Sequence, residues 1–416
     1  MTPREWLQPM FICAYRPFFL LTAASATAAM LVWLLLLNGA LGAWQPPGGI
    51  LLWHAHELLF GFATAAVAGF ALTAIPEFTA TPAITTRPLI HLVSLWLLAR
   101  LAYLLAAYWP AALGLWPAAL LNLAFWAAML VLLAPRLWRD PGRQHLSFAW
   151  AMALLGAVQI GFFAASLVGA DAMAWLRAAT GAMMILIVIA TSRISMSVVN
   201  GQIEEGRPGA PAPTNRYLAR PPRRHLAIFC IALCSASELL LGHHPVSGWT
   251  ALAAAAAMLN LLNDWHIGRP LFNRWALLLY AGYWLLALGY AAMGAAWLGA
   301  PLPPSSGRHL LSSGALSLAV LAVMAMVSRI HTGLWLDRRP WLPLCAVTLL
   351  IAAVLRAWAG LPGTSSSALL MIAGLLWAGC FAVYLGYAWP GLAWPRTDGQ
   401  EGCAAPRAAA PDSSEA

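Results

Sequence analysis

Charge is scarce in this sequence. Of its 416 residues only 9% are charged, and all 23 basic residues are arginine, because the chain has no lysine. Hydrophobic residues make up 62% of the chain, far more than in a soluble globular domain. The formal net charge of +9 comes from arginines scattered in short loops, not from one basic face, so no nucleic-acid partner is expected. The composition excludes a soluble catalytic domain and predicts a protein of the lipid bilayer.

Cysteine motifs are missing as well. The six cysteines lie mostly inside or beside apolar segments, and no Cys-x-x-Cys-His run is present. Neither a disulfide framework nor a covalent c-type haem is therefore indicated. A Rossmann glycine motif is also absent from the sequence, which argues against an attached nucleotide-binding domain.

Long apolar runs fill most of the chain, and twelve of them are long enough to span a membrane. We therefore predict an all-α, polytopic integral membrane bundle of about twelve transmembrane helices. The segments lie at Phe18–Leu37, Ile50–Ile75, Leu89–Tyr108, Leu113–Leu133, Leu146–Val168, Met173–Ala190, Leu226–Leu241, Val246–Leu262, Trp275–Leu298, Leu310–Val327, Trp341–Trp358 and Ala368–Trp389.

The arginines indicate the topology, because cytoplasmic loops are rich in basic residues. Every second loop carries them, at Arg87, Arg136, Arg139, Arg143, Arg207, Arg216, Arg220, Arg223, Arg224, Arg269, Arg274, Arg338 and Arg339. The opposite loops carry little beyond Arg177 and Arg308. We expect an inner membrane location with both termini in the cytoplasm.

One segment, 203–222, is rich in proline, glycine and arginine and divides the chain into two six-helix halves, 1–202 and 223–390. Its composition predicts a mobile cytoplasmic linker. Residues 391–416 turn polar and rich in alanine and proline, which predicts a disordered cytoplasmic tail.

Ionisable residues inside apolar helices are costly in lipid and are therefore candidate functional groups. The segment Ile50–Ile75 has the densest set, with His54, His56 and Glu57. Imidazole is a common ligand of haem iron and copper. On a regular helix the two rings point about 200° apart, so they suit two centres and not one ion. Glu57 shares the face of His54 and is expected to orient that ring; histidines that only link helices by hydrogen bonds are the alternative.

Three further residues join this group through the predicted topology. His309 and Arg356 fall toward the outer side, and Arg100 can reach the same layer. We expect the histidines and Glu57 to converge there with at least one of the two arginines. Arginines beside histidines suit haem propionates or the Glu57 carboxylate itself. An Arg–Glu pair that serves only helix packing is the alternative.

A second candidate group lies at the cytoplasmic boundary and comprises Arg193, Arg329 and His331. Roughly 33 Å of helix separates His331 from His309, so the two cannot share a site. An anchoring role at the membrane interface is the alternative for this group.

Several runs carry a family resemblance. The stretch 53–62, continued by 68–76, is the longest, and shorter runs lie at 15–19, 95–102, His309 and 329–333. Together they resemble the NnrS family, described as twelve-helix, haem- and copper-containing bacterial inner-membrane proteins linked to nitric oxide, nitrosative stress and denitrification. The chain departs from the family pattern after Arg193, where it reads Ile-Ser-Met-Ser, and at Tyr280, where relatives tend to have histidine.

The resemblance implies a membrane protein with haem b, and with copper as a further metal, that handles nitric oxide or iron-nitrosyl species. Its metal ligands would be His54, His56 and His309, with Glu57, Arg100 and Arg356 around the cofactor. The alternative is a transporter of a metal or metal complex that uses the same polar layer. Whether the protein is an enzyme is left open.

The topology is open to a direct test. Reporter fusions at residues 212 and 305 are expected to report opposite compartments, with 212 cytoplasmic, because arginine-rich loops stay inside. Fusions that report the same compartment would contradict the predicted helix count or orientation.

Overall fold

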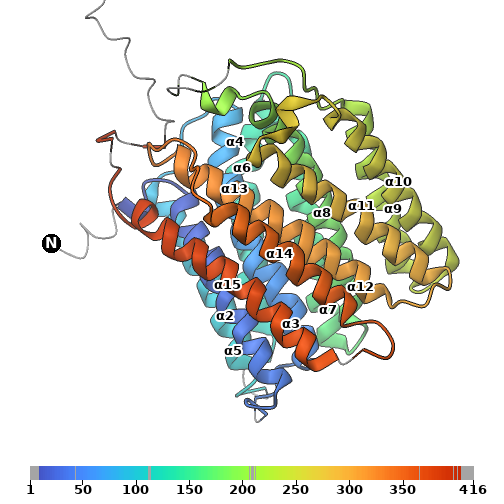
Figure 1. Cartoon of the computed structure of the whole chain (residues 1–416). Coiled ribbons are helices and arrows are strands. Elements are labelled where there is room, and N and C mark those ends of the chain that lie inside the picture. Colours follow the sequence, from blue (N-terminus) through green and yellow to red (C-terminus); the bar gives the residue numbers. More distant parts are fainter. Residues whose placement is uncertain are drawn as a thin grey trace, which may run out of the picture.

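The computed structural model describes residues 9–42, 44–110, 114–205, 207, 210, 212–364, 366–396, 398–400 and 402–403. Within these residues all regular elements are helices, and twelve helices are long and apolar enough to cross a membrane. The predicted all-α, multi-pass membrane fold is confirmed (Figure 1).

The helices follow the apolar segments, with most ends within a few residues of the prediction. They are α2 (Tyr15–Leu37), α3 (Ile50–His56), η1 (Glu57–Ala63), α4 (Thr64–Phe78), α5 (Thr86–Ala106), α6 (Trp116–Arg139), α7 (Leu146–Val168), α8 (Ala172–Val199), α9 (Pro221–Leu241), α10 (Pro245–Leu262), α11 (Arg274–Trp297), α12 (Pro304–His309), η5 (Leu310–Leu316), α13 (Ser317–Ile330), α14 (Trp341–Trp358) and α15 (Ser366–Ala393). Short 3₁₀ turns lie at Gln202–Glu204, Asn263–Trp265 and Arg269–Phe272.

Two of the spanning helices contain a π-helical segment. η1 joins α3 to α4, and η5 joins α12 to α13. A π turn spaces its hydrogen bonds five residues apart, and hydroxyl groups follow that spacing, from Thr64 to the Leu59 carbonyl at 3.3 Å and from Ser317 to the Ser312 carbonyl at 3.1 Å. Each π segment follows directly after a candidate histidine, His56 or His309. The widened turn rotates the rest of the helix relative to that histidine.

The spans that contain η1 and η5, together with α8, form the middle of the bundle. Their most apolar windows are 78%, 67% and 67% buried, whereas those of α5 and α9 are 33% buried. In Figure 1, α8 and α13 run through the centre while α9 and α10 lie at one edge. The candidate residues His54, His56, Glu57 and His309, which these spans carry next to η1 and η5, are therefore placed inside the protein and not against lipid.

The linker and the chain ends lie on one side of the bundle, which we call the linker side; the opposite side is the outer side. Cavities there bring Ile203 and Glu205 of the linker, and Cys13 and Cys403 near the two ends of the described chain, around the same His331. The two cysteines form a disulfide with Cα atoms 6.1 Å apart and 390 residues apart in sequence. The expectation of no disulfide is wrong, because spacing along the chain cannot reveal a pairing made by the fold.

The described part of the linker makes several hydrogen bonds with the helix ends. Tyr217 is buried, its backbone exchanges hydrogen bonds of 3.0 Å with the Asn200 side chain, and its hydroxyl lies 3.0 Å from that of Ser195. The Arg220 amide donates to Asp264 at 3.0 Å. Buried polar groups that are paired in this way hold the segment against the helix ends.

The first described residues of the predicted tail contact the end of α13. Arg396 donates to the His331 carbonyl at 3.2 Å, and the His331 ring donates to the Cys403 carbonyl at 2.5 Å. These contacts hold the described residues after α15 against the end of α13. Residues 404–416, which complete the predicted tail, lie outside the described residues.

Close approach of α11 and α12 depends on glycine. A Cβ at Gly307 would lie 2.5 Å from the Gly289 carbonyl oxygen and 2.7 Å from the Met293 amide nitrogen. Because both neighbours are backbone atoms, Gly307→Ala is expected to force the helices apart and lower the free energy of unfolding by about 1–3 kcal/mol. Thermal unfolding of the purified protein measures this. Gly282→Ala, on α11 with no atom within 4 Å of the new Cβ, is the matched control and should leave stability unchanged or slightly higher; equal losses in both variants would contradict the packing argument.

Candidate functional site

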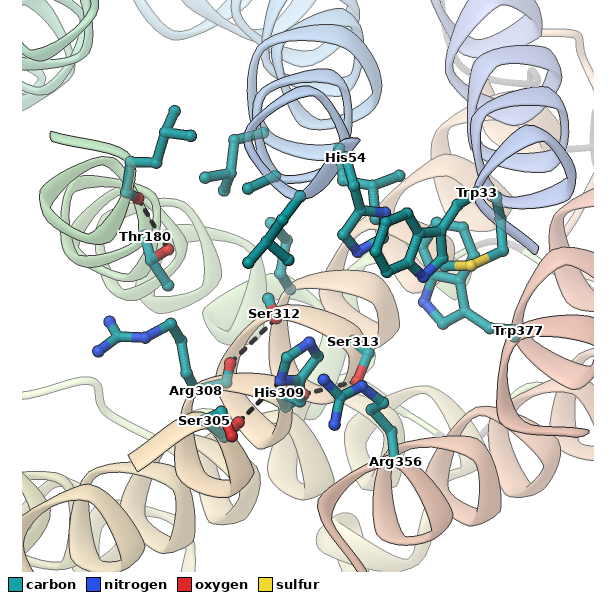
Figure 2. A pocket seen from close by; sticks show the side chains of 18 of the residues that line it. Trp33, His54, Thr180, Ser305, Arg308, His309, Ser312, Ser313, Arg356 and Trp377 are labelled. Atoms are coloured by element: carbon teal, nitrogen blue, oxygen red, sulfur yellow. Dashed lines mark hydrogen bonds between the residues drawn. The ribbon is translucent and has the colours of Figure 1, made fainter. Parts of the chain in front are cut away.

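A cavity of about 260 Å³ lies toward the outer side, enclosed by α2, α3, η1, α8, α12, η5, α14 and α15. We call it the outer pocket. His54 and His309 both line it, from two helices far apart in the sequence, and Figure 2 shows both rings with Arg356 beside His309. The walls are largely apolar, with Trp33 and Trp377 the largest side chains. The pocket thus brings two imidazoles together inside an apolar chamber.

His309 is oriented by its own helix. Its Nδ1 lies 2.7 Å from the Ser305 carbonyl oxygen, which can only accept a hydrogen bond, so Nδ1 carries the proton. The other ring nitrogen, Nε2, therefore has a free lone pair in the neutral ring. A histidine fixed in this way by a carbonyl is the usual arrangement of a metal-ligating imidazole.

His54 is held by stacking. Its ring lies 4.0 Å from the Trp33 ring, centroid to centroid, at an interplanar angle of 20°. Its Nδ1 is buried and has no hydrogen-bond partner among the described residues. Buried polar atoms are nearly always paired, so an unpaired buried nitrogen on a residue that lines a cavity points to a group that this structure does not contain.

Three arginines, Arg177, Arg308 and Arg356, line the outer pocket, and no acidic residue does so among the lining residues that the structure describes. Arg308 is fixed by a bidentate pair with Glu238 of α9, at 2.5 and 3.3 Å. For Arg356 no hydrogen-bond or ion-pair partner is found within the described part of the chain. Arg177 lies 3.9 Å from Asp171, so the positive excess of the pocket rests on Arg356, which suits an anionic group such as a carboxylate.

His56 lies on the opposite face of α3, outside the outer pocket, as the 200° separation predicts. Its Nδ1 is 3.0 Å from Glu57 and its Nε2 is 3.4 Å from the Gln159 amide nitrogen. Glu57 also accepts from Arg100 at 3.1 Å, and Arg100 donates further to Asn122. These five residues form a buried polar network that links η1 to α5, α6 and α7.

The expected convergence of all three histidines with Glu57 is therefore not found. His54 and His309 lie together with Arg356, one of the two expected arginines, whereas His56 and Glu57 pair with Arg100 elsewhere, and Glu57 does not orient His54. The physical reason is the guanidinium on α5, which attracts the carboxylate away from the His54 face because neither charge has water to solvate it. Gly61 allows this approach: a Cβ there would lie 3.1 Å from the Glu57 carboxylate and 3.3 Å from the Arg100 guanidinium.

The second candidate group is split on the linker side. His331 and Arg193 line one cavity of about 310 Å³, together with Glu77, whose carboxylate is 3.9 Å from His331 Nε2. Arg329 lines a different cavity of about 780 Å³. Neither cavity includes a residue that lines the outer pocket, in keeping with the expected separation of His331 from His309.

Comparison with known families identifies the chain. The model of the NnrS protein family matches residues 9–396. The chain belongs to the NnrS family. Among curated proteins no match is found. Family membership supports a role related to nitric oxide at the level of the family.

Sequence reasoning missed Arg177 and Arg308 in the outer pocket of this NnrS-family protein, and it missed Glu238 of α9, which holds Arg308 in place. The two arginines were counted only as charges near outer loops. Glu238 had a detectable signal, because it is an acidic residue inside the apolar segment Leu226–Leu241. The tryptophans gave no such signal, since tryptophan is common throughout this chain.

The Glu57–Arg100 pair can be tested by a double-mutant cycle. Both side chains are nearly buried, at 10% and 13% exposure, so Glu57→Leu leaves an uncompensated guanidinium and should cost about 3–5 kcal/mol of unfolding free energy. The double variant Glu57→Leu/Arg100→Leu should recover much of that loss, because no buried charge remains. Thermal unfolding of the four proteins gives the coupling energy. Additive losses would contradict a direct interaction.

Proposed function

We propose that the outer pocket binds haem b through His54, His309 or both, and that the protein uses this haem to bind nitric oxide or an iron-nitrosyl species. The observation that supports the proposal is the pair of imidazoles with an available ring nitrogen in an apolar chamber lined by three arginines. We place the activity in the protection of a bacterial inner membrane against nitrosative stress.

The donor set fits a macrocycle better than a free ion. Among the described residues no group of three or more His, Cys, Asp or Glu side chains is placed to hold a metal ion. Haem iron needs only one or two axial side chains, because the macrocycle supplies the other ligands. The same shortage of clustered ligands gives copper no independent support, so copper stays a prediction from the family resemblance.

Haem iron with an open axial position binds nitric oxide directly. The protein's own residues would prepare that chemistry. Ser305 keeps the proton on Nδ1 of His309, so that Nε2 can act as the ligand. Arg308, fixed by Glu238, and Arg356 offer donors for propionate carboxylates. Trp33 and Trp377 cover the sides of the chamber and exclude water.

The interior of the bundle favours an uncharged ligand over a charged cargo. A small apolar cavity of about 60 Å³ shares Leu316 with the outer pocket and shares Phe70 and Val323 with the 310 Å³ cavity on the linker side. Thr191 is the only polar residue that lines it among those described. A metal ion in such surroundings loses its hydration with no replacement, whereas a neutral diatomic gas does not. This argues against the transporter alternative for an ionic cargo.

The haem proposal predicts a distinct pattern among four alanine variants. Purified wild-type protein from haem-replete cells should show a Soret band, and His309→Ala and His54→Ala should each abolish or strongly shift it, because both line the outer pocket. His56→Ala and His331→Ala should retain it, since they lie on the opposite helix face and on the linker side. Absorption spectra with iron analysis provide the measurement.

His331→Ala and His56→Ala serve as controls for general loss of folding, and thermal unfolding identifies any misfolded variant. Wild-type protein without haem would refute the cofactor proposal. Loss of haem only in His331→Ala or His56→Ala would refute its location in the outer pocket.

A further inference from the structure

The largest of the cavities described above, about 780 Å³, has no part in the proposed haem site. It lies on the linker side, between the end of α13, the loop 331–340, the start of α14 and the end of α15. We call it the linker-side pocket. Its lining combines arginines with a concentration of aromatic rings: Arg329, Arg339, Trp341, Tyr384, Tyr387 and Trp394.

The aromatic side chains place this pocket at the level of the lipid headgroups. Tryptophan and tyrosine concentrate at the membrane–water interface, where an apolar ring and a polar tip are both satisfied. Trp341 stacks on Tyr387 with ring centroids 4.8 Å apart and an interplanar angle of 15°. Tyr387 is 45% exposed and Val383, one turn away on α15, is 41% exposed, so the pocket opens along the exposed face of α15. The opening therefore leads from a charged end toward lipid.

The charges of the linker-side pocket leave a positive excess. Burial raises the pKa of Asp337, but hydrogen bonds from Arg339 and Trp341 outweigh it and lower the pKa to about 2. Asp337 is therefore ionised at neutral pH and balances Arg339, which it contacts at 2.7 Å. Arg329 uses Nε to donate to the Trp335 carbonyl at 3.1 Å, and its two terminal nitrogens have no partner among the described residues. The guanidinium of Arg329 thus remains available to a ligand in the linker-side pocket.

We propose that the linker-side pocket binds the phosphate headgroup of an anionic phospholipid from the leaflet on the linker side. The phosphate accepts hydrogen bonds from Arg329, and from Nη1 of Arg339, because Asp337 occupies only Nε and Nη2 of that exposed guanidinium. An acyl chain follows the exposed apolar surface of α15 at Val383. Basic pockets between transmembrane helices on the cytoplasmic side are a recognised kind of site for anionic headgroups. The proposal is independent of haem.

The test uses the full-length protein in detergent, with bound lipid counted by native mass spectrometry. Phosphatidylglycerol, phosphatidylcholine and soluble glycerol phosphate are titrated separately. Phosphatidylglycerol should bind at least about five-fold more tightly than phosphatidylcholine, and Arg329→Gln should remove about five-fold in affinity for it, the typical effect of one arginine near an anionic surface. Arg338→Gln is the matched control, an exposed arginine on the same loop that does not line the pocket, and should bind like the wild type.

Three results would overturn the proposal. Equal affinity for the two lipids would remove the charge preference, and an equal loss in Arg338→Gln would indicate general surface charge. Competition by glycerol phosphate at the concentration of the lipid would indicate a site for a free phosphate. The Arg339→Gln variant removes the partner of Asp337, so a change in its lipid affinity is interpreted only if the variant unfolds at the same temperature as the wild type. If it does not, the Arg329→Gln variant alone decides the test.

Discussion

A charge inside a bilayer has no water to solvate it, so an ionisable side chain in the bundle is either matched within the protein or marks a site for a ligand. In this structure the matching determines where the helices meet. Glu57 and Arg100 join the second and third spans, and Glu238 and Arg308 join the seventh and tenth. Because each pair also fixes a helix that carries a candidate histidine, the geometry of the outer pocket depends on these two buried ion pairs.

The two π-helical segments also help to determine the shape of the interior. Each follows a candidate histidine and turns the rest of its helix, so that apolar side chains beyond it face the centre of the bundle. The result is a largely apolar chamber with histidines and arginines toward the outer side, a small apolar cavity in the middle and charged cavities on the linker side. This gradient suits a small neutral ligand in the interior and anionic groups at both ends.

Much of the fold was predictable, because a spanning helix must be long and apolar wherever it lies in the sequence. The twelve spans were found in this way, and the extension of α8 past Ala190 to Val199 was missed because serines and Arg193 end the apolar run before the helix ends. Which side chains form pairs between different helices was not predictable by the same reasoning. Glu57 was assigned to His54 by its spacing on one helix, whereas the deciding charge, Arg100, stands on another helix.

The sequence by itself determined the membrane class, the helix positions and the opposite faces of His54 and His56, since all of these follow from local length, hydropathy and helical geometry. The family resemblance rested on local runs in the same way. Only the tertiary structure decided that His54 meets His309 among Arg177, Arg308 and Arg356, and that Cys13 reaches Cys403. These contacts join residues hundreds of positions apart, and their energies depend on the packing of whole helices, which no local pattern contains.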